Sequence, residues 1–108
     1  MSLLKLRPIH PGEILREQLD ELGMSASAFA ARLNVPTNRI TGLLNKTRSI
    51  TPDTALRLAK VFGGGRDSSR FWLNLQQAYD LRRAELDADE QGYLETIVPV
   101  AIRKRETA

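Results

Sequence analysis

The chain of 108 residues contains no cysteine, which excludes disulfides and thiolate metal ligands and suits a reducing cytoplasm. Its first residues carry too short an apolar run for a signal peptide. No segment approaches the roughly 20 consecutive apolar residues that a membrane-spanning helix requires. The sequence therefore predicts one small cytoplasmic domain that is not in a membrane, with a single modest core.

Residues and motifs typical of catalytic, phosphate-binding or metal sites are also few. The one histidine, His10, stands before Pro-Gly, which is typical of a capping or packing residue. The glycine run 63–65 follows no predicted strand and precedes no Lys-Ser/Thr pair, so it is not a phosphate loop. Carboxylates at 87–90 lack the spacing of an EF-hand and predict a solvated turn. The sequence therefore predicts no enzyme activity, no cofactor and no metal site.

The charge of the chain is unevenly distributed, although the net value is only +3. Residues 32–70 hold eight cations and two anions, a balance of +6, whereas residues 80–95 hold two cations and six anions, a balance of −4. A polyanion such as nucleic acid would be attracted to the first of these segments. An ordinary solvated surface is the alternative explanation.

Hydrophobic periodicity and capping residues predict an all-α chain of five helices. We expect helices at about 11–22, 26–33, 36–44, 52–62 and 68–86, with Ser25 and Thr51 as N-caps and Asn34 in a tight turn. Residues 1–86 would form the domain. Residues 87–108 would be an irregular or partly extended tail that contacts a second copy or a partner, and its apolar residues 97–102 have strand-like propensity.

The segment 25–45 has the layout of a helix-turn-helix, in which the second helix enters the DNA major groove. If Ile40 and Leu43 pack inward, polar residues at the start of the second helix face outward, together with Gly42. An asparagine there can pair with adenine, a threonine methyl can touch thymine, and an arginine can reach guanine or phosphate. The predicted base-contacting residues are Thr37, Asn38, Arg39 and Thr41.

The loop that follows this helix is basic and suits contacts to phosphates, which position a protein without specifying sequence. The residues predicted for this role are Asn45, Lys46 and Arg48. The alternative is that Thr37 and Asn38 merely begin a helix and face water. Gly42 departs from what a base-reading helix would use, because it offers no contacting side chain.

The predicted fifth helix carries more apolar residues than one core requires. Trp72, Leu75 and Tyr79 either complete the core against the first and fourth helices or form part of a homodimer contact. A homodimer is expected on other grounds, because one small helix recognises an operator weakly and such proteins usually bind paired half-sites.

Three stretches together resemble the HigA-type (VapI-like) antitoxins of the XRE, or Cro/C1, helix-turn-helix class. They are HPGEILREQLDELGMS, the helix-turn-helix itself, and ITPDTALRLAKVFG followed by FWLNLQQAYDL, which together cover about residues 8–85. The resemblance implies a five-helix domain of the lambda repressor type. By position, Thr37, Asn38, Arg39 and Thr41 match the operator-facing side of the family's recognition helix, and Arg48 matches its loop contacts.

The resemblance further implies a homodimer that binds double-stranded DNA at a palindromic operator and represses its own operon. It also implies a HigB-like toxin, an mRNA-cleaving ribonuclease, as a protein partner. Family members often have glutamine at the position of Ala26, so that phosphate contact is missing here. Two alternatives stay open: a stand-alone transcriptional regulator, and a protein-interaction module that no longer binds DNA.

Overall fold

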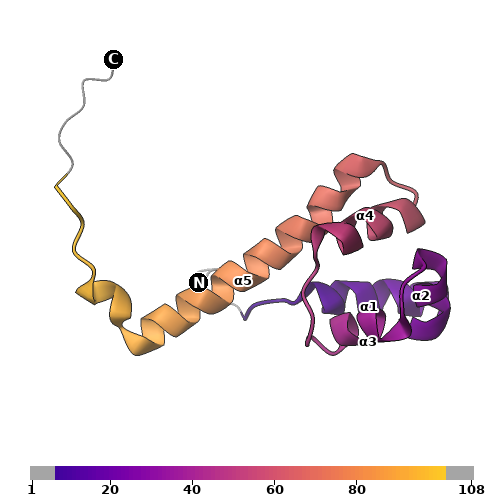
Figure 1. Ribbon diagram of the computed structural model, residues 1–108. Coiled ribbons are helices and arrows are strands. Elements are labelled where there is room, and N and C mark those ends of the chain that lie inside the picture. The colour runs from indigo at the N-terminus through magenta and orange to yellow at the C-terminus, as the bar shows by residue number, and fades with distance from the viewer. Residues whose placement is uncertain (1–6, 102–108) are drawn as a thin grey trace, which may run out of the picture.

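A computed structural model describes residues 7–101, and its regular elements are all helical. The α-helices are α1 (Pro11–Leu22), α2 (Ala26–Leu33), α3 (Thr37–Leu44), α4 (Pro52–Val61) and α5 (Ser69–Gln91), and the 3-10 turns are η2 (Arg66–Ser68) and η3 (Tyr93–Thr96). Figure 1 shows α1 to α4 gathered into a head, with α3 and α4 at opposite edges and α5 running out of it. The expectation of an all-α, five-helix chain is confirmed.

The predicted helix boundaries hold where a cap fixes them. Ser25 and Thr51 each accept a hydrogen bond from a backbone N–H in the first turn, and Pro52 occupies the first position of α4. Asn34 ends α2 in the left-handed conformation (φ 59°), as its position in a tight turn requires. Pro36 is the N-cap of α3 and not its first helical residue, so the helix begins one residue later than predicted.

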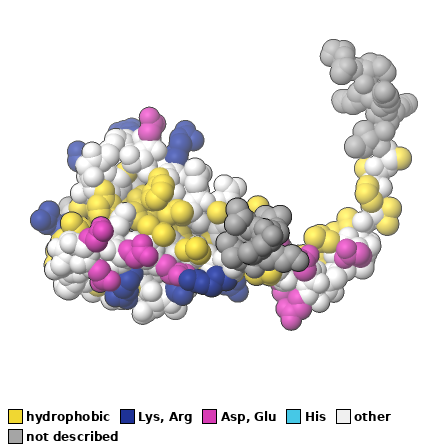
Figure 2. Space-filling view, turned by 180° about the vertical axis from the view of Figure 1, so that it is seen from behind, with side chains coloured by type: hydrophobic (Ala, Val, Ile, Leu, Met, Phe, Trp, Pro, Cys, Tyr) yellow, Lys and Arg dark blue, Asp and Glu magenta, His cyan; other side chains and the backbone are white. Residues whose placement is uncertain are grey.

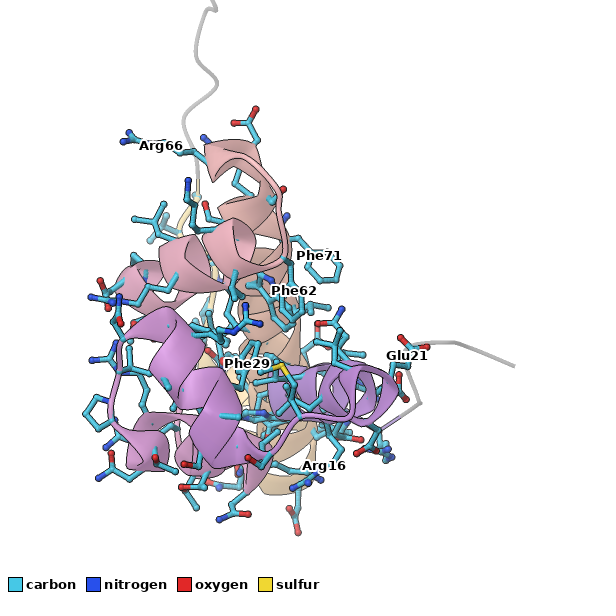
Figure 3. All side chains as sticks on the ribbon, turned by 90° about the vertical axis from the view of Figure 1, so that its right-hand side faces the viewer. Arg16, Glu21, Phe29, Phe62, Arg66 and Phe71 are labelled. Atoms are coloured by element: carbon cyan, nitrogen blue, oxygen red, sulfur yellow. The ribbon has the colours of Figure 1, made fainter. Side chains whose placement is uncertain are left out.

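The core lies where α1, α2, α3 and α4 meet the first half of α5. Its buried members come from every α-helix, and Trp72 is among them with 3% exposure, so the prediction that Trp72 completes the core is confirmed. Trp72 stacks on Phe62, which in turn contacts Phe29 (ring centroids 5.6 Å apart). These rings join α5 to α4 and α2, and Figure 3 shows Phe29, Phe62 and Phe71 one after another between α2 and the start of α5.

The second half of α5 departs from the prediction. The helix continues to Gln91 rather than ending near residue 86, and the expected solvated turn at 87–90 is helical. The reason is local: Asp87 and Gln91 are joined by a side-chain hydrogen bond of 2.8 Å, and Gly92, with φ 69°, is the first residue that ends the helix. Polar composition at 87–91 is therefore compatible with helix, and the prediction of a turn there is wrong.

The chain beyond α5 is irregular and partly extended, as predicted. After η3, Ile97 has extended backbone angles (φ −92°, ψ 118°), and no residue from 97 to 101 belongs to a strand. Ile102 and the basic cluster after it lie outside the described residues. The radius of gyration of 18.4 Å exceeds the value of about 13 Å expected for a compact chain of this length, because α5 and the tail project from the head.

Candidate nucleic-acid interface

Helix α3 sits at one edge of the head and packs against both α1 and α2. Ile40 and Leu43 are fully buried, which orients the helix as predicted. Thr37 and Asn38 lie in its first turn and are exposed, and no side chain caps the N-terminus beside them. The start of α3 therefore presents two small polar side chains and uncapped backbone N–H groups to solvent, an arrangement that favours an anion.

Arg39 and Thr41 are half-buried rather than fully exposed. The guanidinium of Arg39 donates to Asp53 Oδ2 at 2.7 Å, and Arg57 donates to the same oxygen at 2.9 Å. The pKa of Asp53 is lowered by these two hydrogen bonds, first by that of Arg57 and then by that of Arg39. The interface thus contains an acidic residue that holds Arg39 against α4.

Gly42 is buried, and the expectation that it faces outward with Thr37 and Asn38 is wrong. A Cβ atom at this position would lie 2.6 Å from Cδ of Arg48, whose aliphatic stem crosses the helix there. The carbonyl oxygen of Gly42 also accepts from the backbone N–H groups of Thr47 (2.8 Å) and Arg48 (3.1 Å). Gly42 therefore lets the following loop fold back onto α3, and it is not a contact that has been lost.

The loop after α3, residues 45–50, is held at its backbone from two distant helices. Gly12 N–H donates to His10 Nδ1 at 2.8 Å, so Nε2 carries the proton and donates to the carbonyl oxygen of Arg48 at 3.0 Å. The side-chain oxygen of Gln76, on α5, accepts from Ile50 N–H at 2.7 Å. Histidine and glutamine thereby fix the second half of this loop, which we call the strap, and the side chains there start from a defined backbone.

The electrostatics of this strap depend on His10 and Glu13. Burial lowers the pKa of His10, so the ring stays neutral, and it packs edge-on against Tyr79 with centroids 4.8 Å apart. The pKa of Glu13 is lowered to about 2, first by its hydrogen bond with Arg7. Glu13 also lies 3.5 Å from the ammonium of Lys46, which is thus paired but half-exposed.

The predicted phosphate-contacting residues all lie on this strap and are exposed: Asn45, Lys46 and Arg48. Lys46 has a left-handed backbone (φ 65°), which an ordinary L-residue adopts at a cost. The structure therefore brings the seven predicted site residues together on α3 and the loop that follows it. Within that set, Arg39 is already engaged by a carboxylate.

Sequence reasoning missed three residues that shape this surface: His10, Asp53 and Gln76. His10 was correctly predicted to cap or pack, but its bond to Arg48 spans 38 positions and has no local signal. Gln76 stands in the apolar face of α5, where a buried polar residue needs a partner. That rule could have identified it as a structural hydrogen-bonding residue, although not the atom that it binds.

Residues 7–101 contain no group of three or more His, Asp or Glu side chains placed to hold a metal ion. No helix within that range is long and apolar enough to cross a membrane.

Comparison with known proteins identifies the family. The helix-turn-helix family matches residues 15–67. Virulence-associated protein I of Dichelobacter nodosus is 47% identical over 98 residues, which is 90% of this chain and 85% of that protein. A HigA-family addiction module antidote protein from Coxiella burnetii is 52% identical with a TM-score of 0.77, covering 87% of this chain and 99% of that one.

A structure of the Pseudomonas aeruginosa antitoxin HigA with the higBA promoter is 38% identical, with a TM-score of 0.76, and the match covers 88% of this chain and 100% of that one. The similar proteins are DNA-binding regulators and antitoxins rather than enzymes. The likeness extends over the capped α1, the helix-turn-helix and α5 together, as the three sequence stretches predicted. This chain belongs to the HigA-type group of the XRE helix-turn-helix family.

Proposed function

We propose that this protein is a homodimeric repressor that binds a palindromic operator with α3 in the major groove. The observation that carries the proposal is the pairing of an exposed polar helix start, Thr37 and Asn38, with a backbone-fixed basic loop immediately after it. Fixed donors position a protein on the phosphate backbone without an ordering cost at the moment of binding. The similar HigA antitoxin of Pseudomonas aeruginosa was solved with its promoter.

Within this proposal, Asn38 and Thr37 contact base edges, and Thr41 offers a methyl group to a thymine. Asn45, Lys46 and Arg48 contact phosphates. Arg39 reaches DNA only by leaving Asp53, so its contact depends on that competition. The group assigned to sequence readout is therefore small and neutral, whereas the group assigned to positioning is basic.

We propose further that the protein acts in the cytoplasm as the antitoxin of a type II toxin–antitoxin system and neutralises a HigB-like ribonuclease. The similarity to a HigA-family antidote protein at 52% identity supports this partner. The second candidate is a stand-alone regulator, which is favoured by a relative from Escherichia coli named as an HTH-type transcriptional regulator, 39% identical over 106 residues. Purifying the native operon product distinguishes the two: a second small protein accompanies an antitoxin and is absent with a stand-alone regulator.

The operator proposal is tested with Asn38→Ala and a matched control, Asn74→Ala, which removes another exposed asparagine, on α5. Affinity is measured by fluorescence anisotropy on a duplex from the gene's own promoter and on a random duplex at physiological salt. Asn38→Ala should weaken binding to the promoter duplex by about 1–3 kcal/mol and leave binding to the random duplex unchanged. Asn74→Ala should bind both duplexes as the native protein does. A native protein that binds both duplexes equally would refute the repressor proposal.

A further inference from the structure

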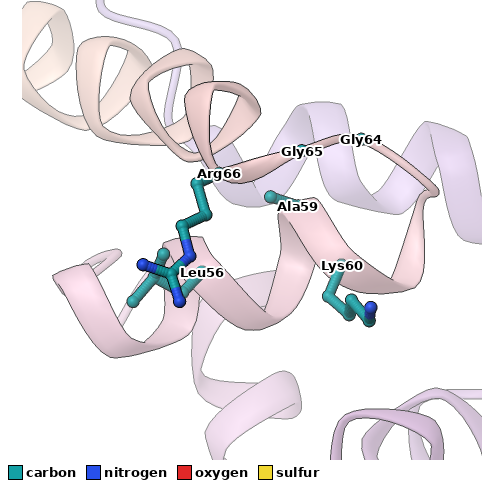
Figure 4. A pocket seen from close by; sticks show the side chains of 6 residues that line it. All are labelled: Leu56, Ala59, Lys60, Gly64, Gly65 and Arg66. Atoms are coloured by element: carbon teal, nitrogen blue, oxygen red, sulfur yellow. The ribbon is translucent and has the colours of Figure 1, made fainter.

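An open groove lies on the outer face of α4, away from α3, and nothing in the described chain fills it. Its volume is about 470 Å³, and Leu56, Ala59 and the glycines that follow α4 form its apolar floor. Lys60 and Arg66 complete its lining with positive charge. Figure 4 shows the side chain of Arg66 extending from the start of η2 toward Leu56. The groove therefore suits an apolar segment with acidic neighbours.

The far end of the same chain carries such a segment. In residues 93–100 the apolar side chains are unusually exposed: Tyr93 42%, Leu94 51%, Ile97 62%, Val98 79% and Val100 80%. Figure 2 shows these apolar side chains along the tail, with acidic ones near the end of α5. A run of exposed apolar residues in a water-soluble domain indicates a contact surface. Glu90 and Glu95 flank this segment with negative charge, which complements the positive charge of Lys60 and Arg66 in the groove.

The tail cannot enter the groove of its own chain. The groove adjoins η2, at the start of α5, and the tail leaves the end of α5, so a helix of 23 residues separates them. At 1.5 Å per residue that helix is about 34 Å long. The seven residues from Gln91 to Val98 span at most about 25 Å when fully extended. Ile97 and Val98 therefore need a groove that belongs to another molecule.

We propose that residues 93–100 of one copy occupy the α4 groove of a second copy, and that the exchange is mutual. Two antiparallel α5 helices related by a two-fold axis place the acidic end of each beside the basic start of the other. Mutual exchange closes the assembly at two copies, whereas a one-way contact would continue into an open chain. This inference rests on the proposed homodimer and names the surfaces that hold it together.

The test places one charge in each half of the contact. Leu56→Asp alters the groove and Val98→Asp alters the tail, and both positions are exposed, so neither substitution disturbs the core. Leu22→Asp is the matched control, because Leu22 has a similar exposure (54%) on α1 and lies in neither surface. Sedimentation velocity over a concentration series should show the dimer dissociation constant raised at least about tenfold by each of the first two variants, and unchanged by Leu22→Asp.

Mixing the two variants gives the decisive measurement. A heterodimer of Leu56→Asp with Val98→Asp combines both altered surfaces in one contact and leaves the other contact native. The mixture should therefore associate more tightly than either variant alone. A mixture that behaves as the sum of its components overturns the mutual exchange.

The failure of this inference is distinguishable from failure of the proposed function. If both variants dimerise as tightly as the native chain and the native chain binds its promoter, the exchange is wrong and the dimeric repressor stands. If the native chain sediments as a 12.1 kDa monomer at tens of micromolar, both the exchange and the dimer are refuted. Circular dichroism of each variant verifies that it is folded.

Discussion

Gly12→Ala should strongly destabilise the fold, because α1 and α3 touch at this glycine. A Cβ atom there would lie 1.9 Å from the carbonyl oxygen of Leu43, where an ordinary contact begins at 3.4 Å. The obstacle is backbone, so the two helices must separate by about 1.5 Å instead of a side chain turning away. Overpacking of this kind costs about 1–3 kcal/mol or more, and the upper end applies because no flexible atom can yield.

Alanine also offsets part of this loss, because its helix propensity exceeds that of glycine by at most about 1 kcal/mol. The expected net loss in the free energy of unfolding is therefore about 2 kcal/mol, or a fall in Tm on the order of 10 °C. Urea and thermal denaturation followed by circular dichroism measure both quantities. Operator affinity should fall as well, because the N–H of Gly12 donates to the ring of His10, and that ring holds the loop after α3.

Gly65→Ala is the matched control for this substitution. No atom lies within 4 Å of the added Cβ, and the backbone of Gly65 is not left-handed (φ −82°). Its stability should stay within about 0.5 kcal/mol of the native value. The close-approach argument is refuted if Gly12→Ala is no less stable than Gly65→Ala.

The remaining predictions concern the groups that hold the interface. Because the pKa of His10 is lowered from 6.5 and that of Glu13 from 4.5 to about 2, the unfolded chain takes up each proton first. The stability that His10 contributes should fall as the pH drops below 6.5, and the stability that Glu13 contributes should fall between pH 4.5 and about 2. Urea titrations at stepped pH measure both losses. His10→Asn should abolish the loss below pH 6.5, and persistence of that loss would contradict the assignment to His10. Gln76→Leu leaves Ile50 N–H buried without an acceptor and should cost about 1–3 kcal/mol in denaturation experiments, whereas an unchanged midpoint would mean that the bond is dispensable. Asp53→Asn removes the carboxylate that holds Arg39, so binding to any duplex should tighten and the salt dependence should steepen by about one phosphate contact; weaker binding would show that Asp53 positions Arg39 for DNA.

Local rules predicted the elements well where one residue decides a boundary. Ser25, Asn34 and Thr51 each act through a bond or a backbone angle within a few residues, and all three have their predicted roles. The end of α5 was placed five residues early, because polar residues at 87–91 were interpreted as a break although they support helix. The residue that ends the helix is Gly92, whose left-handed backbone (φ 69°) closes it.

The orientation of Gly42 shows the limit of periodicity. Outward and inward faces of α3 were assigned from apolar spacing, and glycine carries no polarity by which to assign it. Its burial follows from the loop that folds back over it, and that loop is shaped by bonds from α1 and α5. Likewise, Arg39 was predicted to reach guanine or phosphate, and its ion pair with Asp53 could not be foreseen because it depends on where the first turn of α4 lies.

The sequence by itself determined the family, the five helices and the identity of the polar residues at the start of α3. These follow from short-range signals: caps, apolar spacing and motifs that lie within single segments. The tertiary structure alone decided which of those residues are available and how firmly they are held. His10, Asp53 and Gln76 act on the interface from positions 14 to 38 residues away from their partners. A buried hydrogen bond or a shared carboxylate depends on how helices pack, and no local sequence signal at a single position predicts that packing.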